Sequence, residues 1–287
     1  MSAATTIDLA RAEGVRPARF PWGRWGLRLA AVAYLGLMLI LPLAAVVNDG
    51  LGTGLGGLWA DISRPAAWAA IKLTLWTAGV MTVINTVMGT LMAYVLVRYS
   101  FPGRSIANAI IDIPFAIPTI VTGVMLVILY GPEGALGSWL KESLGWNIIF
   151  APPGIILALL FVSFPFVVRS LQPVLMEVDL DQEEAAYTMG ASPWLTFRRV
   201  LLPAILPAVL TGSILSFARA LGEFGSIVIV AGNFPLRSQT AAVYVLSQIE
   251  SENRRAASAM SLVLLAIAFC LVVMVDLLQR RQERQHG

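Results

Sequence analysis

The chain has 287 residues, of which 57% are hydrophobic and only 13% are charged. Soluble domains carry about 25% charged residues, so this composition excludes an ordinary soluble domain. The formal net charge of +3 is small and gives no indication of nucleic-acid binding. A single cysteine, Cys270, excludes a disulfide framework within the chain, and a single histidine, His286, argues against a metal centre or histidine-based catalysis.

Six apolar stretches are long enough to cross a bilayer, which takes about 20 helical residues. They lie at about 27–47, 68–97, 106–130, 151–173, 204–231 and 256–278. Uninterrupted apolar runs of this length do not fit a β-barrel, whose strands alternate in polarity over about ten residues. The sequence therefore predicts an all-α integral membrane protein with six transmembrane helices. Its predicted parts are an N-terminal tail (1–23), a membrane domain (24–280) and a C-terminal tail (281–287).

The distribution of positive charge predicts the orientation in the membrane, because cytoplasmic loops are enriched in lysine and arginine. Six spans put both termini on one side. That side would carry thirteen of the 20 lysine and arginine residues and the other side six, with Arg219 inside a span. We therefore expect both termini and the loop 174–203 to lie in the cytoplasm.

The third predicted span contains Asp112, Pro114 and Pro118 in its first turns. Prolines there bend a helix and free backbone carbonyls, which is tolerated only where the helix faces protein or water. Two interpretations are open. The span is a kinked helix inside the bundle, or Asp112 belongs to a water-accessible pathway.

The loop 174–203 has the pattern of a helix, a break and a second helix. Residues 184–189 are compatible with a helix, and Gly190 can adopt the left-handed conformation that ends one. Ser192 is a good N-cap and Pro193 a good first residue for the next helix. A membrane-flanking loop built in this way presents a surface to a partner.

The chain does not carry a phosphate-binding loop of its own. Such a loop needs a glycine-rich turn followed by Gly-Lys-Ser or Gly-Lys-Thr. The only two lysines, Lys72 and Lys141, do not follow a glycine. ATP hydrolysis by this chain is therefore not expected.

The loop 174–203 resembles the EAA loop of bacterial ABC-importer permeases. That pattern is E-A-A, three residues, G, nine residues, I, one residue and L-P, and the chain departs from it only in having valine at position 200. The resemblance implies a type I importer permease with a cytoplasmic coupling helix that docks on a separate ATPase subunit. The residues it assigns to coupling are Glu184, Ala185, Ala186, Gly190 and Pro203.

Two charged residues, Arg219 and Glu223, interrupt the fifth predicted span. Such residues in a membrane helix usually face the bundle interior or a water-filled cavity. Their i, i+4 spacing puts them on one helix face, where they can pair. Either they neutralise each other, or Arg219 lines an outer gate and offers positive potential to an anion. The two interpretations do not exclude each other.

The segment 217–226, FARALGEFGS, resembles the permeases for sulfate and molybdate, and the loop 234–245 resembles the sulfate/thiosulfate family in particular. The resemblance covers about residues 24–280. It implies a non-catalytic subunit of the bacterial inner membrane, without a cofactor of its own. The implied partners are two ATPase subunits that bind ATP and magnesium, a second permease subunit resembling CysW, and a periplasmic sulfate/thiosulfate-binding protein.

Two alternatives remain. A molybdate or tungstate permease, working as a homodimer, has the same architecture but is shorter and differs in the loop 234–245. An ion-coupled secondary transporter would carry several intramembrane carboxylates or histidines. Here the only candidates are Asp112, Arg219 and Glu223.

Overall fold

The computed structural model describes the backbone of residues 22–286 and the side chains of residues 25–277. All regular structure in this part of the chain is helical, which confirms the predicted all-α class. The predicted tail 1–23 lies almost entirely outside the described residues. The chain divides into two units, one up to Val47 and one from Asn48 onward.

The first unit is a continuous helical run. It consists of α1 (Trp22–Leu35), one π-helical turn, η1 (Gly36–Ile40), and α2 (Leu41–Leu51), whose last residues belong to the second unit. Residues Trp25–Leu51 are long and apolar enough to cross a membrane, and none of the residues in their most apolar stretch is buried. An apolar helix of this kind needs lipid or another subunit around it.

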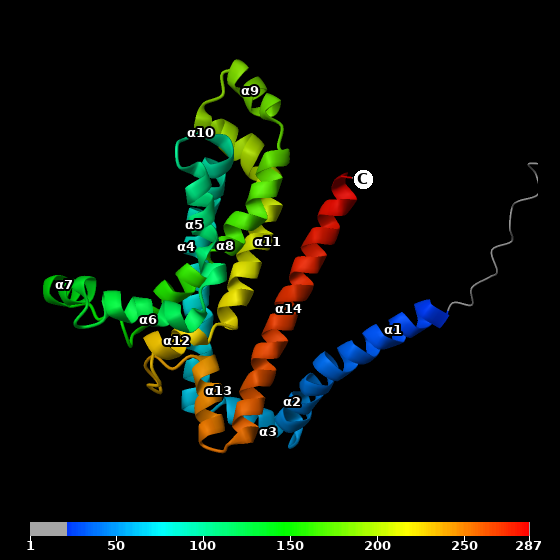
Figure 1. The fold of residues 1–287 in the computed structure, drawn as a ribbon, viewed down its shortest axis with the longest axis vertical. Helices are drawn as coiled ribbons and strands as arrows, with labels where there is room; N and C mark the ends of the chain where they lie inside the picture. The colour runs from blue at the N-terminus through cyan, green and yellow to red at the C-terminus, as the bar shows by residue number, and fades with distance from the viewer. Residues whose placement is uncertain (1–21, 287) are drawn as a thin grey trace, which may run out of the picture. The chain divides into compact units, whose positions relative to one another are not determined.

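The second unit contains the remaining helices, which Figure 1 labels. They are α3 (Gly54–Ile62), α4 (Pro65–Arg98), α5 (Arg104–Ala116), α6 (Thr119–Tyr130), α7 (Ala135–Leu144), α8 (Pro152–Glu177), α9 (Leu180–Thr188), α10 (Pro193–Thr196), the π-helical turn η2 (Phe197–Leu201), α11 (Leu202–Leu221), α12 (Gly225–Val230), α13 (Ala241–Glu250) and α14 (Arg254–His286). In the described chain, five helices are suited to span a membrane, or six if α5 and α6 form one span.

Helices α4, α8 and α11 pack side by side and form the centre of the second unit (Figure 1). Small residues allow their close approach. A Cβ atom on Gly89 of α4 would lie 2.8 Å from the side chain of Val167 in α8. One on Gly212 of α11 would lie 3.1 Å from the Val167 backbone. Such small-residue contacts are typical of helix pairs in membranes, where van der Waals packing replaces the hydrophobic effect.

The third predicted span, 106–130, is broken. Helices α5 and α6 meet at an angle of 108°. The break lies at Ile117 and Pro118, because proline disfavours helical geometry in the residue before it. Helix α6 then packs against α12, where a Cβ on Gly123 would lie 2.8 Å from the carbonyl oxygen of Ser226.

The bounds of the fifth predicted span, 204–231, differ at both ends from the bounds of the observed helices. A single helical run begins at Pro193 and ends at Leu221, and residues Gly225–Val230 form the separate helix α12. The polar interval before this run is therefore shorter than the predicted loop 174–203. Gly222, Glu223 and Gly225 interrupt the apolar composition at this break, but the sequence does not show that the helix ends there.

Candidate coupling surface and charged sites between the spans

Helices α9 and α10 lie together at one end of the α4, α8 and α11 bundle (Figure 1). Asp179 caps α9 by accepting a hydrogen bond from the backbone N–H of Asp181 at 3.1 Å. Gly190 has a φ of +84°, in the left-handed region that favours glycine. Ser192 caps α10 through the N–H of Leu195, and Pro193 is its first residue. The predicted pattern of helix, break and helix is confirmed.

The residues of the EAA pattern divide between two faces of α9. Glu184 and Ala185 are exposed, whereas Ala186 is buried. Exposure leaves the Glu184 carboxylate and the small side chain of Ala185 free to contact another protein. Pro203 lies in the first turn of α11.

Glu183, which precedes the pattern, is buried and was not singled out from the sequence. Its carboxylate lies 2.7 Å from the guanidinium of Arg98, the last residue of α4. Only about a tenth of each side chain is exposed, 10% for Arg98 and 9% for Glu183. Arg98 also donates to the carbonyl of Val178 at 3.2 Å, just before α9. The signal available in the sequence was an acidic residue directly before the EAA pattern, but its partner Arg98 lies far away in the sequence.

Aromatic side chains join η2, in the second half of the segment 178–201, to α4. The rings of Tyr94 in α4 and Phe197 in η2 meet edge to face with centroids 6.4 Å apart. Trp194 stacks on Phe197 with centroids 5.7 Å apart. Edge-to-face and offset-stacked contacts are the favoured geometries of aromatic pairs. The end of α4 thus contacts both helical pieces of the segment.

Asp112 of α5 forms an ion pair with a neighbouring helix. Its two carboxylate oxygens accept hydrogen bonds from Arg169 of α8 at 2.7 and 2.6 Å. The remaining N–H groups of Arg169 donate to the side chain and carbonyl of Asn108 and to the side chain of Gln172. The guanidinium has five N–H donors, and all five have an acceptor. The charge count that predicts the orientation includes Arg169 among the thirteen cytoplasmic charges, whereas the structure places it within the helix α8.

Arg219 and Glu223 pair, as one of the two interpretations expected, but across the end of a helix. Arg219 is in the last turn of α11, and Glu223 follows its C-cap, Gly222. Their charged atoms lie 2.8 Å apart. The other carboxylate oxygen of Glu223 accepts hydrogen bonds from the backbone N–H and the hydroxyl of Ser226, at 2.9 and 2.8 Å. Glu223 is 2% exposed. It therefore holds the first turn of α12.

The guanidinium of Arg219 is less constrained. Its side chain is 31% exposed, and Glu223 is its one ionic or hydrogen-bonding partner among the described residues. Most of its N–H donors are available to a ligand or to water. Arg219 and Glu223 lie at the end of α11 remote from α9, about 39 Å along the helical run from Pro193 at 1.5 Å per residue.

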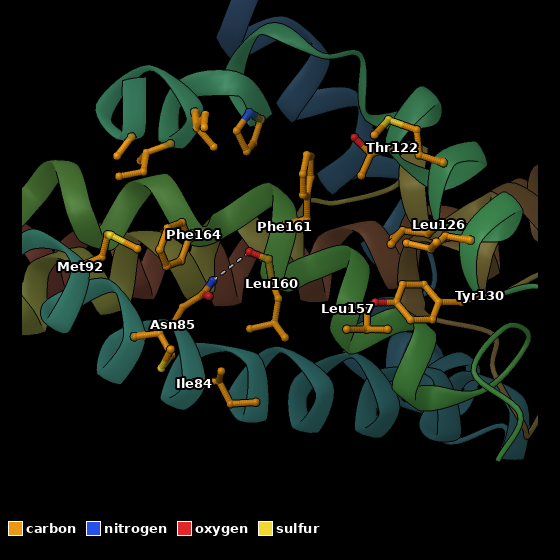
Figure 2. Close-up of a pocket in the computed structure, with 17 residues that line it drawn as sticks. Ile84, Asn85, Met92, Thr122, Leu126, Tyr130, Leu157, Leu160, Phe161 and Phe164 are labelled. Atoms are coloured by element: carbon orange, nitrogen blue, oxygen red, sulfur yellow. Dashed lines mark hydrogen bonds between the residues drawn. The ribbon is translucent and has the colours of Figure 1, made fainter. Parts of the chain in front are cut away.

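A cavity with a volume of about 720 Å³ lies between α4, α5, α6 and α8. Figure 2 shows that aliphatic and aromatic side chains dominate its wall, with Asn85 donating to the carbonyl of Leu160 at 3.4 Å. An anion loses hydration in such surroundings without gaining hydrogen-bond donors. This cavity is therefore unsuited to hold an anion. Within the part of the chain that the structure describes, no group of three metal-ligating side chains occurs.

Comparison with known proteins identifies the family. Residues 85–285 match the family described as binding-protein-dependent transport system inner membrane component. The chain is 43% identical over 255 residues to a protein named probable sulfate transport system permease protein cysT from Chlorokybus atmophyticus, covering 89% of this chain and 88% of the relative. It is 39% identical to the sulfate transport system permease protein CysT of Escherichia coli K12, covering 89% of this chain and 92% of the relative.

The fold is also that of a solved transporter subunit. A chain in the crystal structure of a bacterial alginate ABC transporter, bound to its periplasmic protein with an alginate pentasaccharide, superposes with a TM-score of 0.75. The identity is 18%, and the match covers 91% of this chain and 95% of that chain. The fold class predicted from the sequence, an ABC-importer permease bundle, is confirmed. This chain is a multi-pass membrane protein that belongs to the family of inner-membrane components of binding-protein-dependent transport systems.

Proposed function

We propose that this chain is the permease subunit of an ABC importer that moves sulfate or thiosulfate across the bacterial inner membrane. The observation that carries the choice of cargo is the similarity, at 39–43% identity, to permeases named for sulfate transport. The same similarity favours sulfate over molybdate or tungstate. Membership of the binding-protein-dependent family disfavours an ion-coupled secondary transporter.

The chain acts without covalent chemistry of its own in this proposal. Two separate ATPase subunits bind ATP and magnesium, and each docks on a coupling helix. Exposed Glu184 is the polar anchor for that docking, and exposed Ala185 permits close approach. Gly190 ends α9 in a conformation that costs other residues about 1 kcal/mol or more.

The remaining partners follow from the same proposal. A periplasmic sulfate/thiosulfate-binding protein delivers the anion, and a second permease subunit resembling CysW completes the pathway. Both chain termini and α9 face the cytoplasm, as the excess of positive charge on that side indicates. The opposite end of α11 then faces the periplasm.

Arg219 is the cation that meets the anion at the outer gate. Its partial exposure and its unused N–H donors support this role. Because the contact with Glu223 occupies only part of the Arg219 guanidinium, the remaining N–H donors can bind the anion while the ion pair stays formed. A charge-assisted hydrogen bond to an oxyanion is about twice as strong as a neutral one.

Uptake of labelled sulfate and labelled molybdate, in a strain lacking its own permeases and supplied with the cognate partners, tests the cargo. We expect uptake of sulfate, inhibited by unlabelled thiosulfate. Uptake of molybdate with no uptake of sulfate would overturn the choice of cargo.

Co-purification tests the proposed assembly of this chain with an ATPase subunit. We expect the ATPase subunit to be recovered with this chain, and Gly190→Pro to abolish uptake because proline fixes φ near −65° and cannot adopt +84°. Recovery without an ATPase, together with normal uptake by Gly190→Pro, would contradict an importer permease.

A further inference from the structure

The feature that the proposed function leaves unexplained is the buried ion pair between Arg98 and Glu183. Each side chain is about nine-tenths buried, although both belong to segments at the end of the bundle, where exposed charges would be unremarkable. Burying two charges costs desolvation energy, so such a pair is weak support for stability and is better explained by a need for one defined geometry. The geometry here fixes α9 on the end of α4.

Covalent connections already join the segment to α8 and α11. Helix α8 ends at Glu177, two residues before the cap of α9, and η2 continues directly into α11. Helix α4 has no such connection. Its contacts with the segment include the ion pair, the hydrogen bond from Arg98 to Val178, the Tyr94–Phe197 ring contact and apolar packing in a shared hydrophobic cluster.

Neighbouring positions on α9 have opposite surroundings. Glu184 is exposed, whereas Glu183 is turned inward onto Arg98. A force applied by a partner at Glu184 therefore acts on a helix that is held to α4 one residue away. Both members of the buried pair carry a charge. Separating them would leave two unpaired charges at a site that is shielded from water. Helix α9 and the end of α4 are consequently expected to move together.

We propose that Arg98 and Glu183 are positioning residues that transmit the displacement of α9 to α4. This inference rests on the proposed function, because it takes a movement of α9 by an ATPase as given. Arg98 and Glu183 touch neither cargo nor nucleotide in this proposal. Without the pair, ATP hydrolysis continues but moves α4 incompletely, so less sulfate is carried for each ATP hydrolysed.

The test uses the complete transporter in liposomes, with both permease subunits, the ATPase subunits and the binding protein. The quantity measured is labelled sulfate taken up per ATP hydrolysed. We expect Arg98→Gln and Glu183→Gln each to lower this ratio by about tenfold, within the range by which single residues change coupling between sites. The control, Arg104→Gln, removes a positive charge from the first residue of α5 and is expected to keep the wild-type ratio. Arg104 itself forms no ion pair within the described residues.

Two further variants separate transmission from folding. The neutral double variant Arg98→Gln/Glu183→Gln leaves no unpaired buried charge and is expected to assemble, yet to keep the low ratio. The exchange Arg98→Glu/Glu183→Arg is expected to recover part of it. A wild-type ratio in the neutral double variant would overturn the inference, whatever the single variants do. Failure of the wild-type transporter to take up sulfate would instead contradict the proposed function.

Discussion

The two arginines in the helices α8 and α11 illustrate two uses of the same side chain. Arg169 donates all five of its N–H groups to Asp112, Asn108 and Gln172, and so closes α5 onto α8. Arg219 has Glu223 as its one ionic or hydrogen-bonding partner among the described residues and keeps most of its donors free. Both have a carboxylate partner, so the presence of an ion pair does not distinguish them. The number of satisfied donors does.

This difference separates a packing role from a ligand role. A saturated guanidinium must lose a protein contact before it can bind an anion, and each lost contact to a charged group costs about 1.5–3 kcal/mol. A guanidinium with free N–H donors can bind an anion without that loss. We therefore expect variants of Arg169 to affect assembly, and variants of Arg219 to affect uptake.

The largest effect is expected for Arg169→Ala. Removing one partner of a fully buried ion pair costs about 3–5 kcal/mol. The Arg169 and Asp112 side chains are 33% and 50% exposed, so we expect a smaller loss, about 1.5–3 kcal/mol, as for a hydrogen bond to a charged group. The yield of monodisperse complex and its thermal unfolding midpoint in detergent should both fall. The double variant Arg169→Ala/Asp112→Ala should recover part of the loss. Normal assembly with abolished uptake would place Arg169 among the ligand-binding residues.

Arg219→Ala is expected to lower sulfate uptake by about tenfold, equivalent to about 1.4 kcal/mol. The reason is the loss of the positive charge that we propose meets the anion. Because this change leaves the buried Glu223 carboxylate unpaired, the decisive protein is Arg219→Ala/Glu223→Gln. It should assemble as the wild type does and still show the low uptake. Wild-type uptake by this double variant would leave Arg219 with a purely ionic role toward Glu223.

Glu223→Gln alone should keep uptake within about threefold of the wild type. Glutamine can accept the same two hydrogen bonds from Ser226 through its Oε1, whereas its amide N–H₂ cannot accept from the Arg219 guanidinium. Arg219 keeps its charge in this variant. Initial rates of labelled sulfate uptake are the measurement, and a loss as large as that of Arg219→Ala would assign the function to the negative charge instead.

The smallest effect is expected for Ser226→Ala, which removes one of the two hydrogen bonds to Glu223. The loss should be about 0.5–1.5 kcal/mol of folding free energy, with uptake unchanged. The thermal unfolding midpoint in detergent measures it, and Ser143→Ala in α7, an exposed serine, is the matched control. Equal midpoints for the two variants would show that the hydroxyl does not help to hold α12.

Local features were predictable where their chemistry is local. The break at Gly190 and the cap at Ser192 follow from residue types within one turn of the chain, and both are observed. The bend at Pro118 was expected from proline, but its size was not, because α6 turns to pack against α12. The break between α11 and α12 was missed for the same reason. Gly222, Glu223 and Gly225 were the signals in the sequence, and packing against α6 and the Glu223 cap define the end.

The sequence by itself determined the membrane class, the all-α architecture and the capped helices of the EAA segment, since these depend on composition and on neighbouring residues. Tertiary structure alone decided which charges meet. Arg98 reaches Glu183 and Asp112 reaches Arg169 only because α4, α5, α8 and α9 converge in space. Ion pairs act through space at short range, so residues distant in the chain acquire their roles when the helices pack. That is why Arg169 and Arg219, both arginines within long helices, are distinguished by the acceptors that folding brings to each.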